Sequence, residues 1–297
     1  MQIKPGKSLD LFNMKDLIKI LVLGSNGMIG NSIFNELSKN KSFNVFGTVR
    51  KKGDLNKYLY PEKIISDLDA NKKDEFHKFL INLEPEFVIN CIGITKHNEK
   101  INQELFLNVN SSFSHHLKNC SDKLNFKIIH LSSDCVFSGN KGNYHENDYP
   151  DSNEIYGVSK FLGEITTDPH LTIRTSIVGR EFETSFGLLE WFLSQKDECK
   201  GFKKAFFSGV TTQFLSSIIE KIILEKPDLS GLFHLSGEKI SKFNLLKLFS
   251  KYYSKKIEII PDESFKIDRS LDSKKIYKAL NLKSISWDEM LLKLSSK

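Results

Sequence analysis

Short apolar runs alternate with amphipathic segments over the first 178 residues of the chain. The apolar runs are rich in β-branched and aromatic residues, which is typical of buried strands, and they lie at 18–24, 43–49, 63–65, 86–92, 126–132 and 171–176. The segments between them repeat apolar residues at helical spacing, most clearly at 28–40, 72–83, 102–120 and 156–167. This alternation predicts an α/β fold in which a doubly wound parallel sheet carries helices on both faces.

The pattern becomes less regular beyond residue 178. Helical spacing recurs at 185–195, 211–225 and 241–253, and short strand-like runs occur at 232–235 and 256–260. We expect a smaller C-terminal α/β lobe that binds substrate and completes a cleft. The predicted division is an N-terminal extension at 1–18, a nucleotide-binding domain at 19–178 and a lobe at 179–297 with part returning to the first domain. Because Met14 begins a run that reads like a native start, residues 1–13 are either a dispensable extension or a mis-called start.

A glycine loop joins the first predicted strand to the first predicted helix. Gly24, Gly27 and Gly30 form G-x-x-G-x-x-G, and such a loop lets backbone N–H groups and a helix N-terminus approach a pyrophosphate. The alternative is a simple strand-to-helix turn, but the strand before and the helix after favour dinucleotide binding. The sheet is therefore expected to be of Rossmann type. The predicted cofactor contacts of the loop are Gly24, Asn26, Gly27, Met28, Ile29 and Gly30.

The cofactor preference is predicted from the end of the second strand. About 20 residues beyond the glycines, NAD-binding folds carry an acidic residue for the ribose 2′-OH, whereas this chain has Arg50, followed by Lys51 and Lys52. Guanidinium and ammonium groups suit a 2′-phosphate, so NADP(H) is favoured over NAD(H). The alternative is a solvated basic turn. Asp67 and Leu68 would lie near the adenine, although a helix N-cap is an equally physical role for Asp67 or for Asp69.

Polar residues follow the fifth predicted strand, in "HLSSDCVFSG". Ligands bind at the carboxyl ends of strands in open α/β sheets, so Ser133 could hydrogen-bond a substrate oxygen; the alternative is turn capping. Tyr156 and Lys160 stand four residues apart and would share one face of a helix. An ammonium beside a phenol lowers the phenol pKa, which makes Tyr a usable general acid or base. Ser133, Tyr156 and Lys160 are the predicted catalytic residues.

These motifs together resemble the extended short-chain dehydrogenase/reductase family. The stretches "LSSDCVFSG", "YHENDYPDSNEIYGVSKFLGE", "LTIRTSIVG" and "DRSLDSKKI" are most similar to its dTDP-4-dehydrorhamnose reductase group, from about Lys19 to Leu292. The resemblance implies NADP-dependent reduction of a nucleotide-linked 4-keto-6-deoxy sugar in surface polysaccharide precursor synthesis. The group commonly has Thr at position 133 and an aromatic residue at position 135, where this chain has Ser133 and Cys135.

The resemblance also implies roles for individual residues. Tyr156 would deliver the proton to the C4 oxygen while the nicotinamide gives hydride to C4, and Ser133 would hydrogen-bond the same oxygen. Lys160 would hold the nicotinamide ribose and lower the Tyr156 pKa. Further cofactor contacts would be Cys91, Ile92, Gly93 and Asn110, with Tyr156 and Lys160. The expected substrate contacts are Ser133, Asp134, Val136, Phe137 and Arg269.

Four other residues have two interpretations each. Arg174 ends the sixth strand and serves either structure or substrate. Thr211 lies in a segment that resembles a part of the family near the cleft, or it or Thr212 caps a helix. Trp191 and Phe192 could line a pocket, although an aromatic pair on an amphipathic helix is more often part of the core.

Composition limits the remaining classes of function. The net charge of +6 comes from 43 basic and 37 acidic residues, and the Lys residues are scattered, so a nucleic-acid stripe is not expected. No uncharged apolar run reaches 18 residues and the N-terminus resembles no signal peptide, so we expect no membrane span and a cytoplasmic location. The four cysteines form no C-x-x-C pair, which favours buried thiols over a metal site or disulfides. A homodimer is expected only by analogy.

Two rival functions share most of these motifs. A nucleotide-sugar epimerase uses the same Tyr and Lys but retains its cofactor. A non-catalytic regulatory subunit, like the β-subunit of methionine adenosyltransferase, could keep the residues by descent. The motifs leave open which sugar and nucleotide are used, the product stereochemistry and the oligomeric state.

Overall fold

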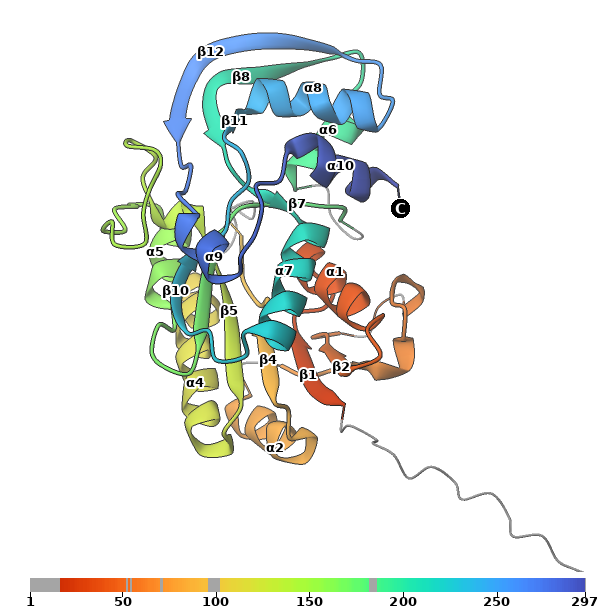
Figure 1. Ribbon diagram of the computed structural model, residues 1–297, viewed down its shortest axis with the longest axis vertical. Helices are drawn as coiled ribbons and strands as arrows, with labels where there is room; N and C mark the ends of the chain where they lie inside the picture. The colour runs from red at the N-terminus through yellow and green to blue at the C-terminus, as the bar shows by residue number, and fades with distance from the viewer. Residues whose placement is uncertain are drawn as a thin grey trace, which may run out of the picture.

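Seven parallel strands form the central sheet of the protein (Figure 1). The computed structural model describes residues 17–51, 53, 55–69, 72–95, 102–181 and 186–296. The sheet order is β10-β6-β5-β4-β1-β2-β3, and each neighbouring pair is parallel. The strands are β1 Ile18–Leu23, β2 Phe43–Thr48, β3 Ile64–Ile65, β4 Phe87–Asn90, β5 Lys127–Ser133, β6 Leu171–Thr175 and β10 Gly231–His234. The predicted Rossmann-type sheet is thus confirmed, with its order reversing between β1 and β4.

Helices cover both faces of this sheet because its strands are apolar on both sides. In β1, Ile20 and Val22 face one core and Leu21 and Leu23 face the other. The first core contains α1 (Met28–Leu37) and α7 (Thr212–Glu225), and the second contains α2 (Lys73–Leu83) and α4 (Phe113–Leu124). A strand buried on both faces reads as a continuous apolar run, which is why the sequence pattern located these strands.

The predicted helix at 102–120 is in fact three consecutive pieces. These are α3 (Gln103–Leu107), a π-helix (Asn108–Ser112) and α4. A π-turn adds a residue to one turn of helix, and here it contains Asn110, whose side chain is fully buried. The helix predicted at 156–167 is shorter, because α5 runs from Ile155 to Leu162. At Gly163 a Cβ would overlap the Asn110 carbonyl, so α5 ends in close contact with the π-helix.

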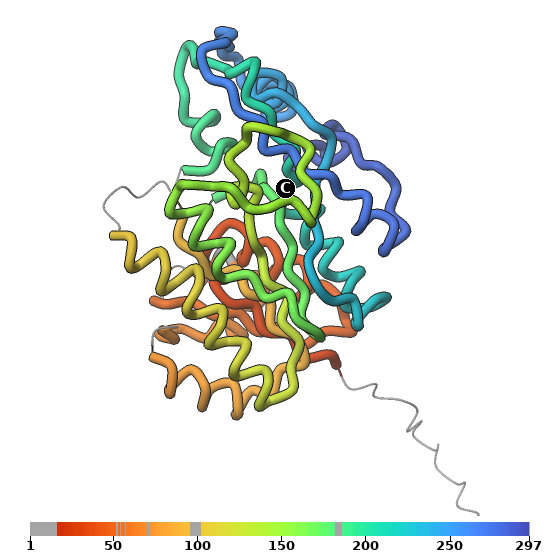
Figure 2. Tube along the Cα trace, turned by 90° about the vertical axis from the view of Figure 1, so that its left-hand side faces the viewer, coloured from red at the N-terminus to blue at the C-terminus, as the bar shows by residue number. Residues whose placement is uncertain are grey.

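The second half of the chain builds a lobe above the carboxyl ends of the central strands, at the top of Figures 1 and 2. Its three-stranded sheet has the order β11-β8-β12, with α8 packed against β8. A separate pair joins β7 and β9, while α7 packs on α1 and α9 on β10. The remaining elements are β7 Ile177–Val178, α6 Leu188–Ser194, β8 Glu198–Phe207, β9 Val210–Thr211, β11 Ile240–Ser241, α8 Lys242–Tyr252, β12 Glu258–Asp268, α9 Lys274–Ala279, α10 Trp287–Ser295 and the 3₁₀ turns Leu55–Lys57, Pro61–Lys63 and Asp134–Val136.

The structure corrects the prediction most in this lobe. Helices α6, α7 and α8 and strand β10 lie where they were expected, but β12 extends to Asp268 instead of 260, and β8 was not predicted. Three lysines in β8, Lys200, Lys203 and Lys204, interrupt its apolar pattern and are exposed. The domain boundary near 178 stays a prediction, and most of the extension at 1–18 lies outside the described residues.

The expectations about a membrane span and about the cysteines can be compared with the described residues. Within them, no helix combines the length and apolar character needed to cross a bilayer. All four cysteines are thiols, of which Cys120 and Cys199 are buried and Cys91 and Cys135 partly buried. Among the same residues no cluster of His, Cys, Asp and Glu could hold a metal ion.

Candidate active site

The glycine loop lies between β1 and α1 in a tightly packed backbone. Gly24 has φ +75, in the left-handed region that favours glycine. A Cβ at Gly30 would overlap the Gly24 carbonyl, and a Cβ at Gly24 would lie 3.3 Å from the Cys91 backbone. Helix α1 begins at Met28, and no side chain caps its N-terminus, so the N–H groups of its first turn remain suited to an anion. The geometry of the loop fits a pyrophosphate.

The predicted ribose-reading residues stand at the carboxyl end of β2. Arg50 and Lys51 are both exposed there, while Lys52 lies outside the described residues. Asp67 follows β3 with φ +64 and accepts a hydrogen bond from the Ser66 hydroxyl at 2.8 Å. Asp67 is not the N-cap of α2, because that position belongs to Lys72. The Leu68 side chain is partly buried against the core of α2 and α4.

Asn110 joins the segment after β4 to α5. Its Oδ1 accepts from the Ile94 N–H at 2.8 Å, and its Nδ2 donates to the Ile94 carbonyl at 3.1 Å and to the Ser159 hydroxyl at 3.0 Å. A Cβ at Gly93 would lie 3.4 Å from Asn110 Oδ1 and 3.8 Å from Lys160 Nζ. Asn110, Gly93 and Lys160 are therefore brought together, as expected of residues that brace one site.

Ser133 ends β5 and lies beside Tyr156. Its hydroxyl accepts from the Cys135 N–H at 3.1 Å, so the capping interpretation is correct, and it also donates to Asp134 at 3.2 Å. The same hydroxyl acts to lower the pKa of the Tyr156 phenol. Tyr156 is partly exposed in the first turn of α5, and at Gly157 a Cβ would overlap the Cys135 carbonyl. This close approach presses the start of α5 against the end of β5.

Burial has the largest effect on the Tyr156 pKa, whereas the sequence predicted an influence of Lys160. Burial raises the pKa of Tyr156 above its usual value, the charges of Cys135 and Asp134 add to the rise, and the Ser133 hydrogen bond and Arg269 oppose it. The Lys160 ammonium extends to the Leu131 carbonyl of β5 at 2.6 Å, and it is not among the five largest influences on the Tyr156 pKa. Burial lowers the pKa of Lys160 itself to about 8.

Arg269 reaches the site from the segment that follows β12. Its Nε donates to the Phe137 carbonyl at 2.8 Å, its Nη2 to Glu154 at 2.7 Å and its Nη1 to the Cys135 sulfur at 3.4 Å. Asp134, another predicted substrate contact, is largely buried, and burial raises its pKa while Arg269 acts to lower it. The positive charge of Arg269 thus lies beside the residues expected to meet the substrate.

Two predicted substrate contacts have side chains that are buried in a core. Val136 and Phe137 are fully buried, and they pack with Tyr144 and Leu271 in a small core of their own. The Phe137 ring stacks on Tyr144 with centroids 4.1 Å apart. Their side chains therefore serve packing, and Phe137 contributes to the site through its carbonyl.

The structure also shows which of two roles Arg174, Thr211, Trp191 and Phe192 have. Arg174 forms a buried ion pair with Glu164 at 2.7 Å, which is a structural contact. Thr211 caps α7 by accepting from the Phe214 N–H at 3.4 Å. Phe192 is fully buried and Trp191 packs against the same core, so the pair belongs to the core.

Two acidic residues of the site were missed by the sequence analysis. Glu154 holds Arg269, which is 115 residues away, so only the fold could reveal the contact. Glu164 stands four residues after Lys160; this helical spacing was the available signal.

A Rossmann-type sheet with a glycine loop and a Tyr-x-x-x-Lys helix beside a strand-end Ser defines the class of extended short-chain dehydrogenases/reductases. Within that class, the family described as RmlD substrate binding domain matches residues 18–294, and the chain belongs to this family.

Curated relatives agree with this assignment. The chain is 26% identical to a dTDP-4-dehydrorhamnose reductase of Aggregatibacter actinomycetemcomitans over 233 residues, which cover 75% of this chain and 74% of the relative. It is 28% identical to the spore coat polysaccharide biosynthesis protein SpsK of Bacillus subtilis (strain 168), over 75% of each chain.

Solved structures show the same fold at lower identity. A dTDP-4-dehydrorhamnose reductase from Bacillus anthracis in complex with NADP has a TM-score of 0.78 at 20% identity, covering 93% of this chain and 98% of that one. The Bordetella bronchiseptica enzyme WbmG in complex with NAD has a TM-score of 0.79 at 14% identity, covering 96% and 95%.

Proposed function

We propose that this protein is an NAD(P)-dependent reductase of a nucleotide-linked 4-keto-6-deoxy sugar that supplies surface polysaccharide synthesis. The observation that carries the proposal is the gathering of Ser133, Tyr156 and Lys160 at the carboxyl edge of the sheet, in a chain of this family. The named reductase and polysaccharide relatives support the substrate class.

The residues suit a carbonyl reduction. The glycine loop and the first turn of α1 would hold the pyrophosphate of a nicotinamide cofactor, which supplies hydride when bound. Because the raised pKa of Tyr156 keeps its phenol protonated near neutral pH, Tyr156 is suited to donate the proton to the carbonyl oxygen. Ser133 would hold that oxygen by hydrogen bonding, and Lys160 would bind ribose hydroxyls. Arg269 would contact the diphosphate of the substrate.

We further propose a preference for NADP(H). Arg50 is exposed at the end of β2, where it can meet a 2′-phosphate. The structural relatives include one complex with NADP and one with NAD, so they support nicotinamide dinucleotides as a class. Steady-state assays with NADPH and NADH test the preference, and Arg50→Ala should reduce the NADPH advantage by about tenfold, which corresponds to ~1.4 kcal/mol. Equal efficiency with both cofactors in the natural protein would remove the argument.

The reductase itself is tested with NADPH and a panel of nucleotide 4-keto sugars, including dTDP-4-dehydrorhamnose, by following nicotinamide absorbance. Tyr156→Phe removes only the phenol oxygen and should lower kcat by a factor of about 10² to 10⁴. Tyr252→Phe is the matched control, because the Tyr252 hydroxyl bonds Asp288 between α8 and α10. Wild-type activity in Tyr156→Phe, or no reduction of any keto sugar, would refute the proposal. Purification with tightly bound oxidised cofactor would favour an epimerase instead.

A further inference from the structure

The ammonium of Lys160 is buried and forms no ion pair with a carboxylate of the described residues. Its residue is 5% exposed, and its Nζ donates to the Leu131 carbonyl. Among the described residues, no carboxylate lies within 4.0 Å of this nitrogen. Burial without a partner favours the neutral amine, which agrees with the lowered pKa of about 8. A nearby negative group must therefore stabilise the protonated form of Lys160 if its ammonium is to bind the ribose.

The ionisable groups around Lys160 identify the compensating charge. Cys91 after β4 and Glu164 just beyond the end of α5 act on it, and Lys160 in turn acts on His130 in β5. Burial raises the pKa of Cys91 to about 12 and lowers the pKa of His130 well below its usual value, so both are neutral at pH 7. Of these three groups, only Glu164 can carry charge at neutral pH.

Glu164 is held in place by an unusually complete set of partners. Its side chain is 4% exposed, and its two oxygens accept from Arg174 Nε and Nη2, each at 2.7 Å. The Ser132 hydroxyl donates to it at 2.7 Å as well. Consecutive residues of β5 therefore hold both groups, since the Leu131 carbonyl binds Lys160 and the Ser132 hydroxyl binds Glu164. The carboxylate cannot move without breaking several buried bonds.

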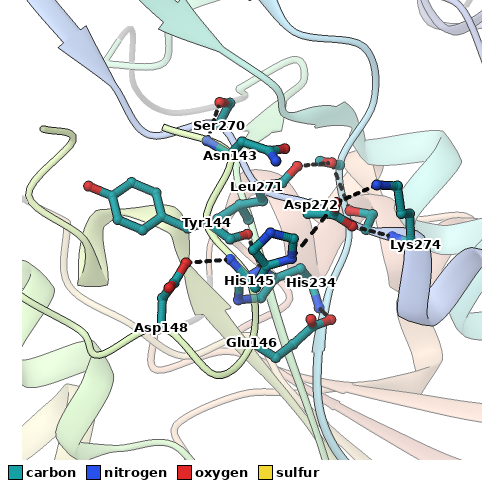
Figure 3. Close-up of polar contacts among 12 residues, drawn as sticks. Asn143, Tyr144, His145, Glu146, Asp148, His234, Ser270, Leu271, Asp272 and Lys274 are labelled. Atoms are coloured by element: carbon teal, nitrogen blue, oxygen red, sulfur yellow. Dashed lines mark hydrogen bonds and ion pairs between the residues drawn. The ribbon is translucent and has the colours of Figure 1, made fainter. Parts of the chain in front are cut away.

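The partner of Glu164 is itself fixed from the opposite side. Arg174 Nη1 lies 3.4 Å from His234 Nε2 in β10, and the guanidinium lies 5.2 Å from the Phe137 ring centre. The Nδ1 of His234 is 3.0 Å from the Tyr144 carbonyl, and its backbone N–H donates to Glu146 at 2.9 Å (Figure 3). Burial and Arg174 lower the pKa of His234 to about 3. The ring is therefore neutral at pH 7 and adds no charge to the Arg174–Glu164 ion pair.

We propose that Glu164 is a positioning residue of the reductase, whose fixed carboxylate holds the Lys160 side chain in its charged, cofactor-binding form. This inference rests on the proposed function, in which Lys160 binds ribose hydroxyls. Glu164 acts through Lys160 and touches neither cofactor nor substrate in this account. Glu164 thus does more than join the end of α5 to β6 through Arg174, because its carboxylate sets the charge of Lys160.

The test is the pH dependence of kcat/KM and of the Lys160 charge in Glu164→Gln. Activity that needs the ammonium falls as pH rises through the Lys160 pKa, near pH 8 in the natural protein. Loss of a nearby opposite charge should move this falling limb to lower pH by about one unit, an activity loss of about fivefold at pH 8 that approaches tenfold at higher pH. Glu164→Asp keeps the charge and should keep the limb in place. Glu225→Gln, which changes an exposed partner of Lys221, is the matched control and should match the natural protein.

A direct titration separates this inference from the proposed function. In the ligand-free protein with ¹³C-labelled lysine, the Lys160 signal, assigned from its loss in Lys160→Gln, should titrate about one pH unit lower in Glu164→Gln. An unchanged titration would overturn the inference whatever the activity. A lower titration in a protein that reduces no keto sugar would support the control of charge and refute the reductase instead.

A second variant covers the case in which Glu164→Gln does not fold. Removing one member of a buried ion pair leaves an uncompensated charge, whereas removing both does not. Glu164→Gln with Arg174→Gln should therefore fold, and because Arg174 is not among the groups that act on the Lys160 pKa, the same lower titration is expected. A Lys160 titration equal to that of the natural protein in this double variant would also refute the inference.

Discussion

At the scale of single residues, Arg269 is the cation with the largest effect on the Tyr156 pKa. Arg269 lowers the Tyr156 pKa against the larger effect of burial, while Lys160 is bound to Leu131 on β5. The guanidinium is fixed by Glu154, which precedes Tyr156 by two residues. A residue from the far end of the chain thus adjusts the acidity of the proposed proton donor.

This assignment predicts the behaviour of Arg269→Gln. Loss of the guanidinium should raise the Tyr156 pKa further and make the phenol a weaker acid, so we expect kcat to fall by up to about tenfold. Arg269→Lys keeps a positive charge without the forked contacts and should recover part of kcat. Steady-state kinetics at fixed pH measure both variants. A change in KM alone would mean that Arg269 only binds substrate.

His234 predicts a pH dependence of folding stability. Its folded pKa is about 3, whereas an unfolded His has a pKa of about 6.5. Between these values the unfolded chain binds a proton that the native protein does not, so stability falls as pH drops from about 6.5 toward 3, by at most ~1.4 kcal/mol per pH unit. His234→Gln should lose this contribution. Urea unfolding at pH 6.5, 5 and 4 measures it, and an identical pH slope in both proteins would contradict it.

At the scale of elements, a strand or helix could be predicted where its residues are buried in a regular pattern, and a contact could be predicted where its residues are close in sequence. Strands such as β4 and β5 were found because both their faces are buried, and the Tyr156–Lys160 spacing placed two site residues on α5. The π-helix was missed because Asn110 bonds Ile94 in another segment, which helical spacing cannot reveal. The packing of the Val136 and Phe137 side chains was not predicted, because the polar run at the end of β5 turns back into the core within a few residues. Contacts such as Glu154 with Arg269 depend on the assembled fold alone.

The close contact between α5 and the π-helix predicts that Gly163→Ala impairs the site. Its Cβ would overlap the Asn110 carbonyl, so α5 would have to shift and carry Tyr156 and Lys160 with it. We expect a destabilisation of about 1–3 kcal/mol and a clear loss of kcat. Gly231→Ala is the control, because its φ of +94 strains the backbone while no atom lies within 4 Å of the new Cβ. If both variants keep full activity per folded molecule, the contact does not position α5.

At the scale of the whole molecule, one apolar core continues from the central sheet into the lobe. It contains Val22 of β1, Ile219 of α7, Phe249 of α8 and Leu291 of α10. A shared core of this kind couples the two parts energetically, so we expect them to unfold together.

Ile219→Ala tests that coupling. Ile219 is fully buried on α7, and its truncation should cost about 2–5 kcal/mol. Leu224→Ala on the same helix is the control, because Leu224 is 45% exposed and its loss should cost under about 0.5 kcal/mol. Urea unfolding is followed by circular dichroism for the whole chain and by the fluorescence of Trp191 and Trp287, which both lie in the second half. Coincident transitions are expected, and earlier loss of the fluorescence signal would show a separately unfolding lobe.

The return of α7 and β10 to the central sheet has a consequence for how this chain could be recombined with its relatives. The lobe is not one transferable module, because α7 and β10 separate its segment within 179–211 from its segment within 235–268, and α10, which packs on α8, follows later in the chain. A chimera that exchanges substrate specificity must graft these segments together and leave the recipient's α7 and β10 in place. A single cut near residue 178 would instead remove one edge strand of the seven and the helix that lies on α1.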